Sequence, residues 1–186
     1  MTKLAPVGFW FLRHGETDWN AANLAQGRVE TRLNARGLQQ AEAAAAALRD
    51  RGIGRLWSSP LLRARQTADV VGDAIGLVPA FDPDLRETSY GVEEGKPMDD
   101  WFADWTAGLS TPDGAESFDE LSARAVLAVN RCIGDGGPAL IVSHGALFRS
   151  LRSAMGLDRN VRTPNAVPIW CAPVESGWQL TALRIG

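Results

Sequence analysis

Residues 9–17 read FWFLRHGET, an apolar run that ends abruptly in an arginine, a histidine and a glycine. Four bulky apolar residues are too few to span a membrane, and they predict a strand buried on both faces in the middle of a sheet. Such a strand brings Arg13 and His14 to its carboxyl end, the edge where open α/β sheets bind ligands. Gly15 then lets the backbone turn and lets a ligand approach closely.

The second histidine of the chain, His144, stands in a similar place. It follows the apolar residues 139–142 and precedes Gly145, so we expect both histidines at the same edge of the sheet. A single histidine beside a glycine at a strand end is more often structural than catalytic, but two of them favour a functional site. Arg13 supports this interpretation, because a buried guanidinium needs an anionic partner, either an internal carboxylate or a bound anion.

Length and composition predict one globular domain over residues 1–186. The chain is 45% apolar and 22% charged, which suffices to bury a core without disulfides or metals. A net charge of -3 without a basic block argues against nucleic acid or an anionic membrane as the main partner. Two isolated cysteines and the lack of a secretory or transmembrane pattern predict a cytoplasmic protein. The oligomeric state is left open.

Strand and helix patterns alternate along the chain. The predicted strands cover residues 9–12, 56–57, 78–81, 139–142, 167–171 and 178–184, and the predicted helices cover 34–48, 60–75, 98–106, 117–133 and 146–155. This order predicts a three-layer α/β/α sandwich with a largely parallel central sheet. Between residues 88 and 116 the periodicity weakens around several glycines and prolines, which predicts a lid or insertion.

Local signals place two of the helices more closely. Asn34 is predicted to cap the first long helix, whose buried stripe should begin at Leu38 and continue through the alanines. Ser59 is predicted to cap the next helix, with Pro60 at its first position. Arg63 then lies in the first helical turn, where free N–H groups and the macrodipole favour anions.

The predicted sheet edge gathers a set of side chains suited to phosphate chemistry, namely Arg13, His14, Arg63 and His144, with Glu87 in a nearby connection. Arginines and histidines can hold phosphoryl oxygens, and a lone acid beside them suits proton transfer. This set fits phosphoryl transfer to a histidine nucleophile. Motifs of cysteine and aspartyl phosphatases, P-loops, serine hydrolases and zinc sites lack the required residues or spacing.

The same segments resemble the histidine phosphatase superfamily, which includes the phosphoglycerate mutases. RHGET at 13–17, SSPLLRARQTA at 58–68, LRE at 85–87 and VSHG at 142–145 match its four signature segments in order. The resemblance implies a phosphoglycerate mutase-like fold, phosphorylation of His14 and proton donation by Glu87. It also implies that the phosphate is held by Arg13, Asn20, Arg63, His144 and Gly145.

The chemistry sets conditions that the structure must meet. His14 must be neutral to attack phosphorus, and burial beside two guanidinium groups disfavours its protonated form. Its far ring nitrogen needs a fixed acceptor, for which we expect a backbone carbonyl. Glu87 would protonate the departing alkoxide and then activate the water that cleaves the phosphohistidine, so no metal or cofactor is required.

Two other functions are kept as alternatives. A phosphotransferase of the phosphoglycerate mutase type would need a closed site and extra cationic residues. The resemblance also implies a longer insertion between the acid and the second histidine in mutases, and the short insertion here favours a phosphatase. A phosphate-binding protein without activity would be expected to lack His14 or Glu87, and this chain has both.

The substrate is expected to be a small phosphomonoester, with Gln26, Gly27, Tyr90, Trp101 and Trp105 lining its pocket. The segment after Glu87 is acidic, and an acidic rim repels a second anionic group. Its acids are Glu93, Glu94, Asp99, Asp100, Asp104, Asp113, Glu116 and Asp119. We therefore expect a neutral, positively charged or aromatic leaving group. In the alternative, the tryptophans pin the segment to the core and the acids form a solvated face.

Overall fold

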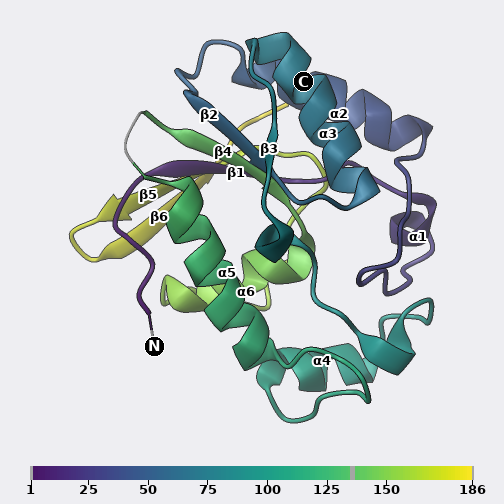
Figure 1. Ribbon diagram of the computed structural model, residues 1–186. Coiled ribbons are helices and arrows are strands. Elements are labelled where there is room, and N and C mark those ends of the chain that lie inside the picture. The colour runs from purple at the N-terminus through teal and green to yellow at the C-terminus, as the bar shows by residue number, and fades with distance from the viewer. Residues whose placement is uncertain (1, 135–136, 186) are drawn as a thin grey trace.

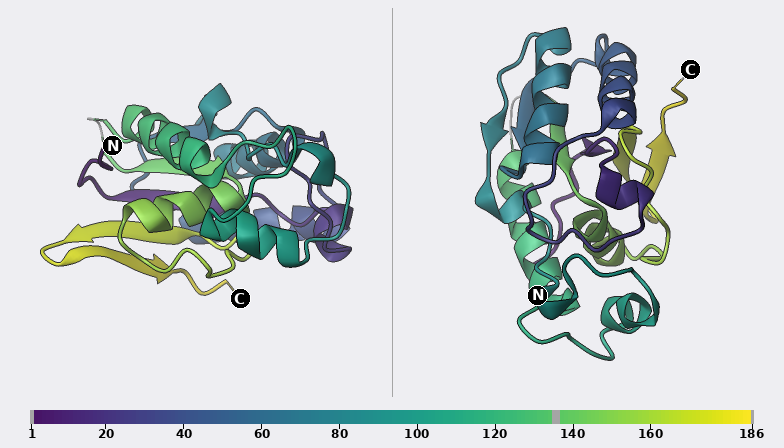
Figure 2. Two further views of the ribbon diagram at one scale, coloured as in Figure 1. Left: turned by 90° about the horizontal axis from the view of Figure 1, so that it is seen from below. Right: turned by 90° about the vertical axis from the view of Figure 1, so that its right-hand side faces the viewer.

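The computed structural model describes residues 2–134 and 137–185. Within them, a six-stranded sheet runs in the order β3-β2-β4-β1-β5-β6 (Figure 1). The strands are β1 (Phe9–Arg13), β2 (Arg55–Ser58), β3 (Ala80–Phe81), β4 (Ala139–Ser143), β5 (Ile169–Val174) and β6 (Gly177–Ala182). The four strands from β3 to β1 are parallel, and β5 and β6 pair antiparallel. The β5–β6 hairpin extends from one side of the sheet (Figure 2).

Helices cover both faces of the sheet. They are α1 (Asp18–Ala21), α2 (Ala35–Leu48), α3 (Leu62–Ile75), α4 (Asp100–Ala107), α5 (Phe118–Cys132) and α6 (Gly145–Ala154), with short 3-10 turns at Pro83–Leu85 and Gly91–Glu93. The strands lie between the α2–α3 pair and the α5–α6 pair (Figure 1). The three-layer α/β/α architecture predicted from the sequence is therefore confirmed. No helix in the described residues is long and apolar enough to cross a membrane.

Strand β1 joins the two halves of the core. Phe9 and Phe11 pack into the cluster with α5 and α6, whereas Trp10 and Leu12 pack into the cluster with α2 and α3. Successive side chains of a strand point to opposite faces, so an uninterrupted apolar run is what a central strand requires. Each fully buried side chain of this size contributes about 1.5–3 kcal/mol, and the run fixes β1 at the centre.

Two details of the helical predictions are wrong. Leu38 is 41% exposed, because α2 instead turns Gly37 and its alanines toward the core. Helix α3 begins after Leu61, which makes no side-chain cap bond, and not after Ser59. The Ser59 hydroxyl instead lies 2.7 Å from Nε2 of His144, so this residue is engaged in the site. Strand β3 is also shorter than predicted, since Val78 is almost fully exposed.

Two glycines let the loop after β1 rest directly on the first turn of α2. A Cβ atom on Gly15 would collide with the backbone oxygen of Gly37, and one on Gly37 would collide with that of Glu16. The Gly15 N–H also donates to Oγ1 of Thr67 on α3 at 3.0 Å. The sequence suggested that Gly15 makes room for a ligand, but in the structure it makes room for a helix.

The segment predicted as a lid or insertion is packed against the body of the domain. Trp105 of α4 is fully buried and its ring contacts Phe118 of α5, with the ring centroids 5.4 Å apart. An isolated bridge joins Pro97 of the segment to Leu24 after α1, while a second bridge, between Tyr90 and Ala115, joins the two ends of the segment to each other. Residues 88–116 therefore form a wall beside the carboxyl end of the sheet, and their opening as a lid stays a prediction.

Candidate active site

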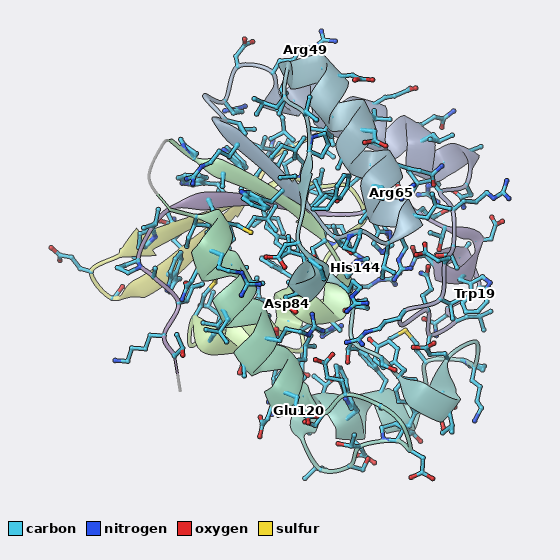
Figure 3. All side chains as sticks on the ribbon, viewed as in Figure 1. Trp19, Arg49, Arg65, Asp84, Glu120 and His144 are labelled. Carbon is cyan, nitrogen blue, oxygen red and sulfur yellow. The ribbon has the colours of Figure 1, made fainter. Side chains whose placement is uncertain are left out.

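A cavity of about 220 Å³ lies at the carboxyl ends of β1 and β4, between α1 and the 88–116 segment. Of the residues predicted from the sequence, those that line it are Arg13, His14, Asn20, Gln26, Gly27, Arg63, Glu87, Tyr90 and Gly145. His144, Trp101 and Trp105 are not part of its lining. Figure 3 shows His144 near the centre of the molecule and Trp19, another lining residue, on α1 at the outer side.

His14 follows β1 directly, and its ring is almost completely buried. Its Nδ1 lies 2.7 Å from the backbone oxygen of Gly15, the kind of fixed acceptor that the sequence argument required. Arg63 Nε donates to Nε2 of His14 at 3.3 Å. A donor on one ring nitrogen and an acceptor at the other assign the neutral tautomer, with the Nε2 lone pair facing the arginine.

The surroundings of His14 keep the ring neutral. Burial lowers the pKa of His14 well below its ordinary value, and the charges of Arg63 and Arg13 lower it further. The hydrogen bond to Gly15 acts in the opposite direction and is outweighed. A neutral imidazole is the form that can donate its lone pair to an electrophile.

Arg63 lies in the first turn of α3 and is 1% exposed. Its Nη2 donates to the Gly27 oxygen at 2.8 Å and its Nη1 to the Val29 oxygen at 2.9 Å. These bonds tie the loop after α1 to α3 and hold the guanidinium against His14. Burial lowers the pKa of Arg63, and the charge of Glu87 partly offsets this effect.

Arg13 is held from the other side of the cavity. Its Nη1 donates to the Thr163 oxygen at 2.8 Å, while its buried Nε has no hydrogen-bond partner among the described residues. Burial lowers the pKa of Arg13 to about 10. In the described part of the chain, neither Arg13 nor Arg63 forms an ion pair. Of the two partners considered from the sequence, an internal carboxylate paired with Arg13 is not found in this part of the chain, and a bound anion stays a prediction.

Glu87 is anchored to the amino terminus of α6. Its Oε2 accepts the N–H of Ala146 at 3.0 Å, and its Oε1 accepts the N–H groups of Leu147 and Thr88, each at 3.1 Å. Free N–H groups at a helix start hold a carboxylate well. The acid is thus fixed in the cavity wall by the same helix that follows the second histidine.

His144 lies beside His14 but deeper in the protein. The two ring centroids are 5.2 Å apart, and Nδ1 of His144 is buried with no partner among the described residues. Burial lowers the pKa of His144 well below its ordinary value, with Arg63 the next cause. The structure therefore brings the two histidines together as predicted, while direct contact of His144 with phosphate stays a prediction.

The two buried histidines give the fold a pH dependence. Because their folded pKa values are depressed, the unfolded chain binds more protons below its histidine pKa of about 6.5, and the free energy of unfolding falls as the pH drops. We expect a slope of up to about 1.4 kcal/mol per pH unit for each histidine, measured by urea unfolding between about pH 6.5 and 5.5. The variant His144→Gln should show a smaller slope. A free energy that stays constant over this range would contradict the neutral, buried state.

Two amide side chains in the cavity wall, Asn20 and Gln26, accept hydrogen bonds through their oxygens. Asn20 Oδ1 accepts from the Thr17 N–H and from Nδ2 of Asn165, both at 3.2 Å, and Gln26 Oε1 accepts the hydroxyls of Thr17 and Thr31. Within the described residues, the NH₂ groups of Asn20 and Gln26 form no hydrogen bond, so both are free donors beside the cavity. Asn165, which the sequence argument missed, also donates to the His14 oxygen at 3.0 Å.

The prediction that Trp101 and Trp105 line the pocket is wrong. Each ring lies 5.3 Å from the ring of Tyr90, and the two tryptophans pack behind it. Their indole N–H groups donate to backbone oxygens, which explains why they are turned away from the cavity. Met98 and Phe102 take their place in the lining.

The predicted acidic rim is also wrong. None of the acids between residues 93 and 119 lines the cavity, because the aspartates are exposed at the surface and the glutamates bind other residues. Glu94 accepts the backbone N–H of Arg28 and of Tyr90, and Glu116 pairs with Arg124 at 2.6 Å. The lining instead contains two arginines that the sequence argument missed, Arg149 and Arg162. The sequence could have indicated Arg149, because it lies one helical turn after Gly145 and therefore on the same face of the predicted helix.

No group of three or more His, Cys, Asp or Glu side chains is arranged to hold a metal ion in residues 2–134 and 137–185.

Comparisons with known proteins show the family of the chain and relatives of its fold. The family model for the histidine phosphatase superfamily (branch 1) matches residues 9–180. A protein of Yersinia pestis (strain Pestoides F) named probable phosphoglycerate mutase GpmB is 38% identical over 186 residues, covering 91% of this chain and 86% of its own. A solved mycobacterial glucosyl-3-phosphoglycerate phosphatase, in complex with VO3, has a TM-score of 0.82 at 30% identity, covering 97% of this chain and 100% of that one. A phosphoserine phosphatase mutant from Entamoeba histolytica, with phosphoserine, shares the fold at 22% identity and a TM-score of 0.80, covering 94% of each chain.

Proposed function

Because the chain belongs to the histidine phosphatase superfamily (branch 1), we propose that it hydrolyses a small phosphomonoester through a phosphohistidine formed on His14. The observation that carries this proposal is the neutral imidazole of His14, with Nε2 beside Arg63 in a cavity also lined by Arg13. The lone pair of this nucleophile accepts only a long bond from Arg63, and neither guanidinium forms an ion pair within the described residues. This arrangement favours attack on a phosphoryl group, whose equatorial oxygens carry the negative charge.

The reaction has two displacements. In the first, Nε2 of His14 bonds to phosphorus, the ester P–O bond breaks, and protonated Glu87 gives its proton to the leaving oxygen. In the second, ionised Glu87 takes a proton from water, the water oxygen bonds to phosphorus, and the P–N bond breaks. Inorganic phosphate leaves, and His14 and Glu87 return to their starting states.

The phosphoryl oxygens have several donors within the cavity wall. The unpartnered Nε of Arg13 and the free NH₂ group of Asn20 are available to an anion without breaking an existing bond. Arg63 contributes its charge, and it would exchange its long bond to His14 for one to the phosphoryl group. Such fixed donors stabilise the transition state without reorganising during the reaction.

A second candidate is a phosphotransferase of the mutase type, which is favoured by the name of the relative that is 38% identical. The two functions share the first displacement and differ in what accepts the phosphoryl group. Water ends the reaction in a phosphatase, whereas a mutase returns the group to another oxygen of the substrate.

The test is the incubation of the purified protein with p-nitrophenyl phosphate, with and without a chelator. We expect release of nitrophenolate and phosphate at equal rates in both samples, since the proposed steps need no metal ion. No turnover at any pH would favour a phosphate-binding protein, and loss of turnover with chelator would contradict the metal-free mechanism. Isomerisation of 3-phosphoglycerate faster than its hydrolysis would identify a mutase.

A further inference from the structure

Two arginines that the proposed mechanism does not use line the same cavity as His14. Arg149 lies in the second turn of α6, and Arg162 lies in the connection between α6 and β5. They come from different elements, so their meeting at one cavity is a product of the fold and not of a local charged run.

Arg149 is held in place. Its Nη1 donates to the Arg159 oxygen at 2.8 Å, and its guanidinium lies over the ring of Phe102, 5.4 Å from the centroid. Burial is the main cause that lowers the pKa of Arg149, and the charges of Arg152 and Arg162 lower it further. The ring covers one face of the guanidinium and Arg159 takes a bond from Nη1, which leaves the other edge N–H groups to bind a planar anion.

The positive charge in this cavity exceeds what one phosphoryl group needs. The lining contains four arginines, Arg13, Arg63, Arg149 and Arg162, and one acid, Glu87. None of these arginines forms an ion pair within the described residues. A phosphate dianion beside His14 offsets about two positive charges, which leaves the outer pair without a counter-charge. Such a pair is complementary to a second anionic group on the same ligand.

We infer that the substrate of the proposed phosphatase carries a carboxylate on its alcohol portion, and that Arg149 and Arg162 bind this carboxylate. The inference rests on the proposed function. A cavity of about 220 Å³ admits a small phospho-acid. A carboxylate is planar and compact, so it matches the fork of a guanidinium without needing the space of a second phosphate. This conclusion replaces the neutral or cationic leaving group predicted from the sequence, because the acids on which that prediction depended do not line the cavity.

The first part of the test compares esters that differ only in the carboxylate. Phosphoglycolate is compared with ethyl phosphate, and 3-phosphoglycerate with glycerol 3-phosphate, by kcat/KM for phosphate release. The acid of each pair should be preferred by about 10-fold to 100-fold, the usual size of a charge-assisted hydrogen bond. Equal values within both pairs would overturn the inference, and a preference for fructose 1,6-bisphosphate over both acids would assign the arginine pair to a phosphate.

The second part uses variants of the arginine pair. Arg162→Gln is the decisive one, because this side chain is exposed and its loss should not unfold the protein. The preference for the acid of each pair should fall by about tenfold or more in Arg162→Gln and in Arg149→Gln. Arg152→Gln is the matched control on the same helix, since Arg152 does not line this cavity, and it should keep the preference of the parent protein. A preference that survives both substitutions would overturn the inference.

Hydrolysis of p-nitrophenyl phosphate, which has no carboxylate, separates the proposed phosphatase function from the proposed carboxylate site. If the parent protein hydrolyses it without preferring the acids, the carboxylate site fails and the phosphatase function stands. If the parent protein hydrolyses none of these esters, the phosphatase function fails, and the inference fails with it.

Discussion

The substitution His14→Ala should abolish hydrolysis of every phosphomonoester, with kcat reduced by about 10⁴-fold or more. The reason is that Nε2 of His14 is the proposed nucleophile, and His144, the other histidine, does not line the cavity. The initial rate with p-nitrophenyl phosphate measures the loss. A ³²P-labelled substrate, quenched in alkali, should label the parent protein with an acid-labile phosphoramidate and leave the variant unlabelled.

The control for this variant is its stability. Removing the ring leaves Arg63 Nε facing the cavity, where water can replace the lost acceptor, so the free energy of unfolding should change by only about 1–3 kcal/mol. A folded variant that keeps more than about one hundredth of the parent rate would contradict a covalent role for His14. Its residual binding of phosphate would instead measure what the arginines contribute by themselves.

The substitution Glu87→Gln should have the second largest effect, and its size should depend on the leaving group. A positioned general acid contributes about 10²-fold to 10⁴-fold, so alkyl phosphates should lose that much in kcat/KM. Nitrophenolate is a stable anion that leaves without a proton, so p-nitrophenyl phosphate should lose far less in the first step. The plot of rate against leaving-group pKa should therefore become steeper in the variant.

Glu87→Gln also changes a structural contact, which must be measured separately. The amide NH₂ of glutamine would face the N–H of Ala146 or Leu147, because both carboxylate oxygens of Glu87 accept from α6. We expect a loss of about 1–3 kcal/mol in the free energy of unfolding. Equal losses of activity for alkyl and nitrophenyl esters would show that the variant fails through a displaced α6 and not through a missing proton.

The parts of the fold that depend on apolar patterning were predictable from the sequence. The runs at β1 and β4 are buried on both faces, so they had to be central strands, and their carboxyl ends had to bring His14 and His144 together. The acceptor for Nδ1 of His14 was predictable for a chemical reason, because a neutral nucleophile needs a fixed tautomer. These predictions rest on features encoded within a few neighbouring residues.

The parts that depend on how a helix is rotated were not predictable. Helix α4 turns Trp105 into the core and Phe102 toward the cavity, and both choices satisfy the same apolar pattern. The acids of that segment then find partners such as Arg124 that are distant in sequence. Arg162 reaches the cavity through a connection without periodicity. The sign of the charge around the site follows from these contacts, and composition alone gave the opposite sign.

The first two turns of α6 hold three parts of the site at once. His144 occupies the N-cap position without a side-chain capping bond, the N–H groups of Ala146 and Leu147 hold Glu87, and Arg149 lines the cavity. For protein engineering, a redesign of specificity that shifts α6 would therefore also displace the acid. The connection that carries Arg162 does not bind Glu87. Substitutions in this connection are therefore the better choice for a library that seeks new substrates while retaining turnover.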